Sequence, residues 1–198
     1  MRCLRQLALA LAAVAVVTVA SAQTSTPVQA QGLFSFFSGQ LPRETVVWRH
    51  SHRPGTIVVS FGDRRLYKVM RGRRAISYPI AIPRNISRWS GTLSVTRKAV
   101  NPSWTPTPRM RRENPKLPAY VPGGHPRNPM GVRALYLGST MYRIHGTDAP
   151  WTIGKAVSKG CIRMYNSHVV DLYNRTRTGT RVIVTWKRYR PRQVAGFW

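Results

Sequence analysis

Short apolar stretches rich in Val, Ile, Leu and Tyr recur along most of the chain, and loops containing Gly or Pro separate them. This pattern is typical of β-strands. Residues 56–61 and 65–70 flank a Gly62-Asp63 turn, which predicts a hairpin. The further predicted strands are residues 75–81, 93–98, 133–137, 141–144 and 181–186. Short strands with few helices predict a mainly β fold, a sandwich or a barrel.

A first small helix is predicted at residues 108–113, with Thr107 as its N-cap and Pro108 at its first position. The Asn114-Pro115 pair would end it. This helix lies within a proline-rich segment, residues 101–129, which is longer than most loops inside a compact domain. Loops of this length are usually functional.

A second short helix is predicted to begin at Asn166, which would act as its cap. Val169, Val170 and Tyr173 then recur at helical spacing, and Gly179 would end the helix.

The N-terminus predicts export. A basic start, an apolar run of 13 residues and an Ala20-Ser21-Ala22 cleavage site together indicate a signal peptide over residues 1–22. A membrane anchor is the alternative, but the run is shorter than the ~20 residues that span a bilayer. Residues 23–45, rich in Gln, Ser, Thr and Ala, are predicted to form a linker, residues 46–188 one folded domain, and residues 189–198 a C-terminal tail.

The chain is strongly basic, with 32 Lys and Arg against 5 Asp and Glu, a formal net charge of +27. Loss of Arg2 and Arg5 with the signal peptide would leave +25. The cations are scattered over strands and loops and no nucleic-acid motif is present, so nucleic acid is not a predicted partner. An exported cationic protein would instead meet anionic cell-wall polymer, lipopolysaccharide or acidic phospholipid. A specific docking role and a generally basic surface are equally open.

Cys161 would be the only cysteine of the mature chain, because Cys3 lies in the predicted signal peptide. A lone exported cysteine is a route to dimers or a reactive thiol, and a buried inert cysteine is a further alternative. Thiol catalysis needs a base, a group that orients the base, and donors for an oxyanion. His145 is the candidate base, and the backbone N–H groups of Gly160 and Cys161 are the candidate oxyanion hole. The carbonyl of Gly146 is the preferred orienting group.

Asp148 is an alternative orienting group, as a third catalytic member. The remaining histidines, His50, His52, His125 and His168, have neither metal-site spacing nor the acidic neighbours of a hard-metal site. The sequence therefore predicts no metal and no cofactor.

Between residues 142 and 166 the chain contains His145-Gly146-Thr147, Ile153-Gly154, Ser158-x-Gly160-Cys161-Ile162-Arg163-Met164 and Asn166. This series resembles the L,D-transpeptidase catalytic domain, a cysteine-dependent family of the bacterial cell wall. The similarity extends from about Thr56 to Trp186. In one departure, Lys159 stands where many members have histidine, which leaves His145 as the only candidate base.

The resemblance implies a mainly β L,D-transpeptidase-like fold located in the periplasm or cell wall. It also implies that Cys161 attacks a peptidoglycan tetrapeptide stem, releases D-alanine, and passes the acyl group from a thioester to an amine acceptor. The candidate substrate-binding residues are Arg163, Ser158, Trp104 and Tyr120. Arg163 would bind a carboxylate or brace the cysteine loop, and Ser158 would also hold the turn. Residues 101–129 would form a flap beside the catalytic cleft, with Trp104 and Tyr120 as apolar walls.

Two alternatives belong to other functional classes. One is a hydrolase of the same family, an L,D-carboxypeptidase or amidase-type enzyme that uses water as acceptor. The other is a catalytically silent cationic wall-binding module. The predicted partners are peptidoglycan stem peptides and possible anionic cell-wall or outer-membrane components.

Overall fold

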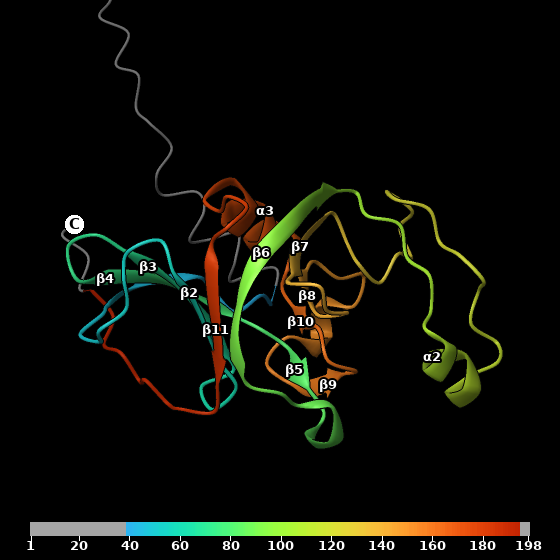
Figure 1. Ribbon diagram of the computed structural model, residues 1–198, viewed down its shortest axis with the longest axis horizontal. Coiled ribbons are helices and arrows are strands. Elements are labelled where there is room, and N and C mark those ends of the chain that lie inside the picture. The colour runs from blue at the N-terminus through green and yellow to red at the C-terminus, as the bar shows by residue number, and fades with distance from the viewer. Residues whose placement is uncertain (1–38, 195–198) are drawn as a thin grey trace, which may run out of the picture.

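The computed structural model describes residues 39–194, apart from the side chain of Ile86. The predicted signal peptide, most of the predicted linker and the last four residues lie outside this range. The strands are β1 (Glu44–Val47), β2 (Ile57–Ser60), β3 (Arg65–Met70), β4 (Arg74–Pro79), β5 (Ile82–Pro83), β6 (Gly91–Val100), β7 (Arg133–Leu137), β8 (Arg143–His145), β9 (Ala156–Ser158), β10 (Ile162–Arg163) and β11 (Arg181–Thr185). The helices are α2 (Pro108–Glu113) and α3 (Asn166–Asn174), with single 3₁₀ turns η1 (Asn85–Ser87) and η2 (Pro150–Thr152). The prediction of a mainly β fold with two short helices is confirmed (Figure 1).

Nine strands form one curled sheet in the order β1-β4-β3-β2-β11-β6-β7-β8-β10. The long strand β6 joins its two halves: residues Gly91–Ser94 pair with β11, and residues Val95–Val100 pair with β7. The register shifts between Val95 and Arg97. A strand that bends at such an irregularity can serve both halves of a sandwich-like fold. Figure 1 shows β6 arching between them.

One core fills the space between the two halves. It combines buried residues of β2 and β3 with those of β7, β8 and β10, and with Val169 and Leu172 of α3. Helix α3 packs against β7 and β8. Since apolar burial is the main source of folding free energy, the half that carries the candidate active site depends on the other half for its stability.

The outer face of the first half is also covered. Along β2, Ile57 and Val59 belong to the main core, whereas Val58 belongs to a second cluster with Trp48 and Tyr67. This alternation follows from the two-residue period of a strand. Tyr189 packs on the second cluster, so the chain after β11 closes it.

The predicted strands correspond to β2, β3, β4, β6, β7, β8 and β11, with ends that differ by up to two residues. The short strands β5, β9 and β10 were not predicted, because two or three residues carry no measurable periodicity. Strand β1 was also not predicted, because its first two residues fall in the predicted linker and its place in the sheet depends on pairing with β4. Helix α2 has its predicted bounds, and Thr107 accepts a hydrogen bond from the N–H of Met110 at 3.3 Å. No helix within residues 39–194 is long and apolar enough to cross a membrane.

The predicted ends of the second helix were wrong. Asn166 is the first helical residue of α3, and the capping position belongs to Tyr165, which makes no side-chain cap. The Asn166 side chain instead accepts hydrogen bonds from neighbouring loops. The helix ends at Asn174 and not at Gly179, which belongs to the turn that leads into β11.

Asp171 of α3 ties the helix to the first half of the sheet. Its carboxylate accepts hydrogen bonds from Arg43 at 2.5 Å, from the hydroxyl of Tyr78 at 2.6 Å and from Arg175 at 2.9 Å. Burial alone would raise the pKa of Asp171, but these three donors outweigh it and lower the pKa. The carboxylate is therefore a structural charge.

Asp171→Asn should lower the free energy of unfolding by about 1–2 kcal/mol, because three charge-assisted or buried contacts are weakened at a partly solvated site. A carboxyl with a lowered folded pKa stabilises the protein above its ordinary pKa, and that stabilisation is lost as pH falls through the folded value. The difference between the two proteins in urea unfolding should thus shrink below about pH 4. Ser167→Ala, an exposed substitution on the same helix that touches no titratable group, is the control, and its difference from wild type should not change with pH. A difference that stays constant down to pH 2 would contradict this role.

Candidate active site

Cys161 lies in the tight turn that joins β9 to β10. Ser158 closes this turn, because its hydroxyl donates a hydrogen bond of 2.5 Å to the carbonyl of Cys161. The same hydroxyl accepts the N–H of Gly160 over a long 3.5 Å, so that N–H is poorly satisfied. Ser158 is buried, and its hydrogen bond to the Cys161 carbonyl is the turn-holding contact that the sequence predicted. A direct contact between Ser158 and substrate stays a prediction.

Gly160 has to be glycine. Its φ of +132° is a conformation that side chains rarely adopt, and a Cβ would lie 2.9 Å from the ring of Tyr142. Trp89 stacks on Tyr142 with 4.2 Å between ring centroids, and its indole N–H donates to the Gly160 carbonyl at 3.0 Å. Two aromatic side chains therefore hold the turn in front of the cysteine.

His145 comes from β8, which pairs in parallel with β10, so that Arg163 is opposite His145 and Ile162 is opposite Ile144. This register places the imidazole beside the cysteine turn. Nδ1 of His145 lies 2.6 Å from the Gly146 carbonyl, the contact that the sequence predicted. That carbonyl takes the position which Asp148 would need as an orienting group.

The loop after His145 is held by Asn166. Its side-chain oxygen accepts the N–H groups of Thr147 at 3.1 Å and Val132 at 3.4 Å. A Cβ on Gly146 would lie 2.2 Å from this oxygen, so any larger residue would displace it. The sequence predicts Asn166 as a helix cap. In the structure its side chain instead joins two loops that are brought together only by the fold.

The resting pair of candidate catalytic groups is uncharged at neutral pH. Burial lowers the pKa of His145 to about 3, with a further contribution from the charge of Arg163, against the opposing effect of the Gly146 carbonyl. Burial also raises the pKa of the Cys161 thiol, although Arg143 and Arg163 oppose that shift. The thiol donates a weak hydrogen bond to the Met141 carbonyl at 3.7 Å. Cys161 nevertheless keeps some exposure, because it opens onto a cleft.

This cleft has a volume of about 410 Å³, within the range of small-molecule sites. Cys161, His145 and Arg163 line it together with Trp104, while α2 contributes Met110. The predicted nucleophile and base therefore line the same cleft. Trp104 is a wall of the cleft, as expected from the sequence.

The structure does not bring Tyr120 to the cleft. Its side chain is 56% exposed, whereas the neighbouring Val121 is 7% exposed and pairs through its backbone with Trp104. Adjacent residues of an extended segment point to opposite sides, so the inward position of Val121 turns Tyr120 to solvent.

Arg163 lies on the floor of the cleft and is largely buried. Burial lowers its pKa, and the nearby charge of Asp148 opposes that shift. A guanidinium nevertheless stays protonated in proteins. Its Nε is buried and makes no hydrogen bond to any part of the chain that the structure describes. An unpaired buried donor is uncommon in native structures, and this one lies beneath the surface of the cleft that Arg163 lines.

An ion pair links the flap to the cysteine turn. Glu113, the last residue of α2, pairs with Lys159, and it also accepts a hydrogen bond of 2.9 Å from Arg109. These hydrogen bonds, the one from Lys159 first, lower the pKa of Glu113. The link gives Lys159 a contact with α2, and no spacing in the sequence relates residues 113 and 159.

Sequence reasoning also missed Met141, Tyr142 and Arg143 as lining residues of the cleft. The sequence pattern before His145 predicts a strand, but so short a run does not show which side chain faces the cysteine. Among residues 39–194, His, Cys, Asp and Glu side chains do not gather in threes that could hold a metal ion.

Comparison with known proteins places this site in a family. The model of the YkuD L,D-transpeptidase catalytic domain matches residues 54–184, about two thirds of the chain. The probable L,D-transpeptidase ErfK/SrfK of Escherichia coli is 44% identical over 138 residues, which are 64% of this chain and 42% of that protein. The putative L,D-transpeptidase YkuD of Bacillus subtilis is 36% identical over 135 residues, 66% of each chain. The chain thus spans about two fifths of the ErfK/SrfK relative.

Solved structures agree on the fold. An L,D-transpeptidase from Mycobacterium smegmatis superposes with a TM-score of 0.52 at 18% identity, over 66% of this chain and 58% of that one. An L,D-transpeptidase from Enterococcus faecium gives 0.51 at 18% identity, over 67% and 50%. At this identity the likeness concerns the fold alone. Together with the family match, it confirms the resemblance read from the sequence: the chain belongs to the family of YkuD-type L,D-transpeptidase catalytic domains.

Proposed function

We propose that this protein is a cysteine-dependent L,D-transpeptidase that acts on peptidoglycan tetrapeptide stems. The observation that carries the proposal is that His145 of β8 and Cys161, directly before the paired strand β10, line one open cleft inside the segment that matches the family. The substrate class comes from the family. The predicted signal peptide supports an extracytoplasmic site of action.

The imidazole is oriented to accept a proton. Because a carbonyl can only accept hydrogen bonds, its contact with Nδ1 assigns the proton to that nitrogen and leaves the lone pair on Nε2. Nε2 of His145 takes the thiol proton as the sulfur of Cys161 attacks the amide carbon. The buried pair starts uncharged, so charge develops during the attack and is not stored at rest.

The remaining steps conserve atoms and protons. The carbon–sulfur bond forms, the tetrahedral intermediate collapses, and the carbon–nitrogen bond to D-alanine breaks. The leaving amine takes the proton from His145. An acceptor amine then attacks the thioester with His145 as base, the new amide forms, and the thiol regains its proton.

The developing oxyanion has two donors nearby. The poorly satisfied N–H of Gly160 and the N–H of Cys161 lie on the same turn, which Ser158 and Trp89 hold rigid. Preorganised donors of this kind typically contribute ~10²–10³ in rate. Arg163 lines the cleft and is suited to a carboxylate of the stem peptide, because guanidinium binds that group through parallel hydrogen bonds.

Purified mature protein incubated with disaccharide-tetrapeptide should give a crosslinked dimer with release of D-alanine, detected by mass spectrometry. Adding a free D-amino acid should divert the acyl group to that amine. Exclusive formation of tripeptide would instead identify a hydrolase. If neither product appears and no thioester is trapped on Cys161, the enzymatic proposal is wrong.

Cys161→Ala should lower turnover by on the order of 10⁶-fold, to below detection, because no other thiol lines the described cleft. The melting temperature should change little, since the thiol borders the cleft. Ser103→Ala, on the same cleft, is a matched control that should keep its activity. Wild-type turnover in Cys161→Ala would refute the assignment.

The acidic limb of kcat/KM should lie below about pH 5, because a base works only above its pKa and that of His145 is about 3. Arg163→Gln removes a charge that lowers this pKa, so its acidic limb should move upward toward the ordinary value near 6.5. The limb is read from the pH profile, independently of any rise in KM. A wild-type limb near pH 6.5 would contradict the buried, neutral imidazole.

A further inference from the structure

A second cavity lies away from the cleft, at the opposite end of the sheet. It has a volume of about 590 Å³ and is bounded by β1, the turn between β3 and β4, and the C-terminal end of α3. In the strand order, β1 and β4 stand at one edge, whereas β8 and β10 stand at the other. The cavity is therefore separate from the proposed catalytic chemistry. We call it the arginine pocket.

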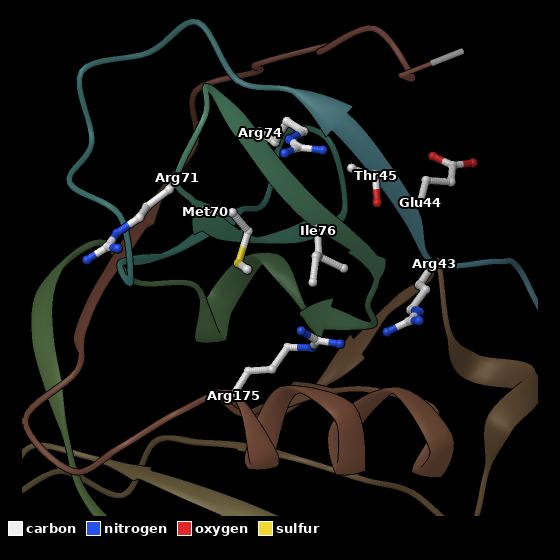
Figure 2. A pocket seen from close by; sticks show the side chains of 8 residues that line it. All are labelled: Arg43, Glu44, Thr45, Met70, Arg71, Arg74, Ile76 and Arg175. Carbon is white, nitrogen blue, oxygen red and sulfur yellow. The ribbon is translucent and has the colours of Figure 1, made fainter. Parts of the chain in front are cut away.

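Four of the eight residues that line the arginine pocket are arginines (Figure 2). Arg43 precedes β1, Arg71 and Arg74 flank the β3–β4 turn, and Arg175 follows α3. Three segments far apart in sequence thus contribute guanidinium groups to one cavity. Figure 2 shows Arg43 and Arg175 approaching each other from opposite sides, with Arg74 above them.

The carboxylates near the arginine pocket do not balance these charges. Arg43 and Arg175 share Asp171, and Glu44 pairs with Arg65 at 2.9 Å. Five guanidinium groups therefore meet two carboxylates in the described structure, which leaves three positive charges in excess. Like charges held together cost folding free energy, so a bound anion would stabilise the pocket.

The β3–β4 turn itself is costly as built. Its residues 71–74 read Arg-Gly-Arg-Arg, and Arg73 adopts a left-handed φ of +52° next to Gly72 at +70°. Hairpin turns of this shape favour Asn and Gly, which avoid both the steric cost and the charge repulsion. Of the three arginines in the β3–β4 turn, Arg71 and Arg74 line the arginine pocket, and Arg73 does not.

The floor of the arginine pocket is apolar. Met70 and Ile76 point from β3 and β4 into the cavity, and Ile76 is 9% exposed (Figure 2). Guanidinium groups above an apolar floor strengthen hydrogen bonds to an anion, because less water competes for them.

We propose that the arginine pocket binds a phosphate group, carried by a membrane phospholipid headgroup or by a soluble phosphate ester. The guanidinium groups of Arg43 and Arg175 face each other with Arg74 above them, while Arg71 extends away from these three at the edge of the cavity (Figure 2). Several guanidinium forks lining one cavity match the three or four oxygens and the high charge of phosphate better than the single plane of a carboxylate. The apolar floor accommodates the carbon atoms next to the phosphate. Binding at this site does not require a working Cys161.

The test uses the full mature chain at constant ionic strength. Inorganic phosphate and glycerol phosphate are titrated by calorimetry, with acetate for comparison, and binding to phosphatidylcholine vesicles with and without phosphatidylglycerol is measured by cosedimentation. Arg71→Gln/Arg74→Gln should weaken phosphate or vesicle binding about tenfold or more, since each charged hydrogen bond is strong. Arg71→Lys/Arg74→Lys should restore only part of the affinity, because lysine keeps the charge and loses the fork.

Arg112→Gln/Arg127→Gln is the matched control, because both arginines are exposed on the flap and their loss changes the net charge equally. It should bind like wild type, as should Cys161→Ala. A defect with vesicles alone identifies the lipid headgroup, and a defect with the soluble anions as well identifies a phosphate ester. Equal losses in the two double variants, no loss in either, or acetate bound as tightly as phosphate would overturn the proposal. Arg71 and Arg74 are exposed, so their variants should fold, and circular dichroism checks this. Because the arginine pocket is separate from the cleft, failure of this proposal leaves the proposed catalysis untouched.

Discussion

The parallel pairing of β8 with β10 is the interaction on which the site depends. It aligns Arg163 with His145 and thereby sets the cysteine turn beside the imidazole. Two strands in parallel need a long connection between them, and here residues 146–161 supply it with η2, β9 and the turn itself. The same connection that satisfies the topology therefore also delivers the proposed nucleophile. Burial of Ile144 and Ile162 in the main core keeps the pair in register.

The scarcity of acidic residues shapes the rest of the molecule. Asp63 accepts hydrogen bonds from Tyr67 and from the backbone of Tyr189, and Asp171 ties α3 to the sheet. Glu44 and Glu113 form ion pairs, while Asp148 acts on Arg163 through its charge. Every carboxylate side chain of the sequence thus has an identifiable structural task. The excess of cations is left for solvent and for ligands.

The sequence predicted those features that depend on local patterns. The strands with clear periodicity, helix α2 with its Thr107 cap, and the contact between His145 and the Gly146 carbonyl are all present. The shortest strands, the role of Asn166 and the position of Tyr120 escaped prediction. Each of these depends on long-range contacts: the oxygen of Asn166 joins two loops, and the inward side chain of Val121 decides where Tyr120 points.

The arginine pocket escaped prediction for the same reason. Its guanidinium groups come from residues 43, 71, 74 and 175, and no spacing in the sequence relates them. The composition signalled an anionic partner, but only the fold shows where the charge is concentrated. The same amino-acid composition can give either a generally basic surface or a defined cationic cavity, so composition does not distinguish them.

The ion pair between Lys159 and Glu113 ties α2 to the turn that carries the proposed nucleophile. Both side chains are partly exposed, so the pair contributes little to stability and is screened by salt. The position of α2 beside the cleft is therefore sensitive to ionic strength, whereas the turn itself is held by the uncharged contacts of Ser158 and Trp89.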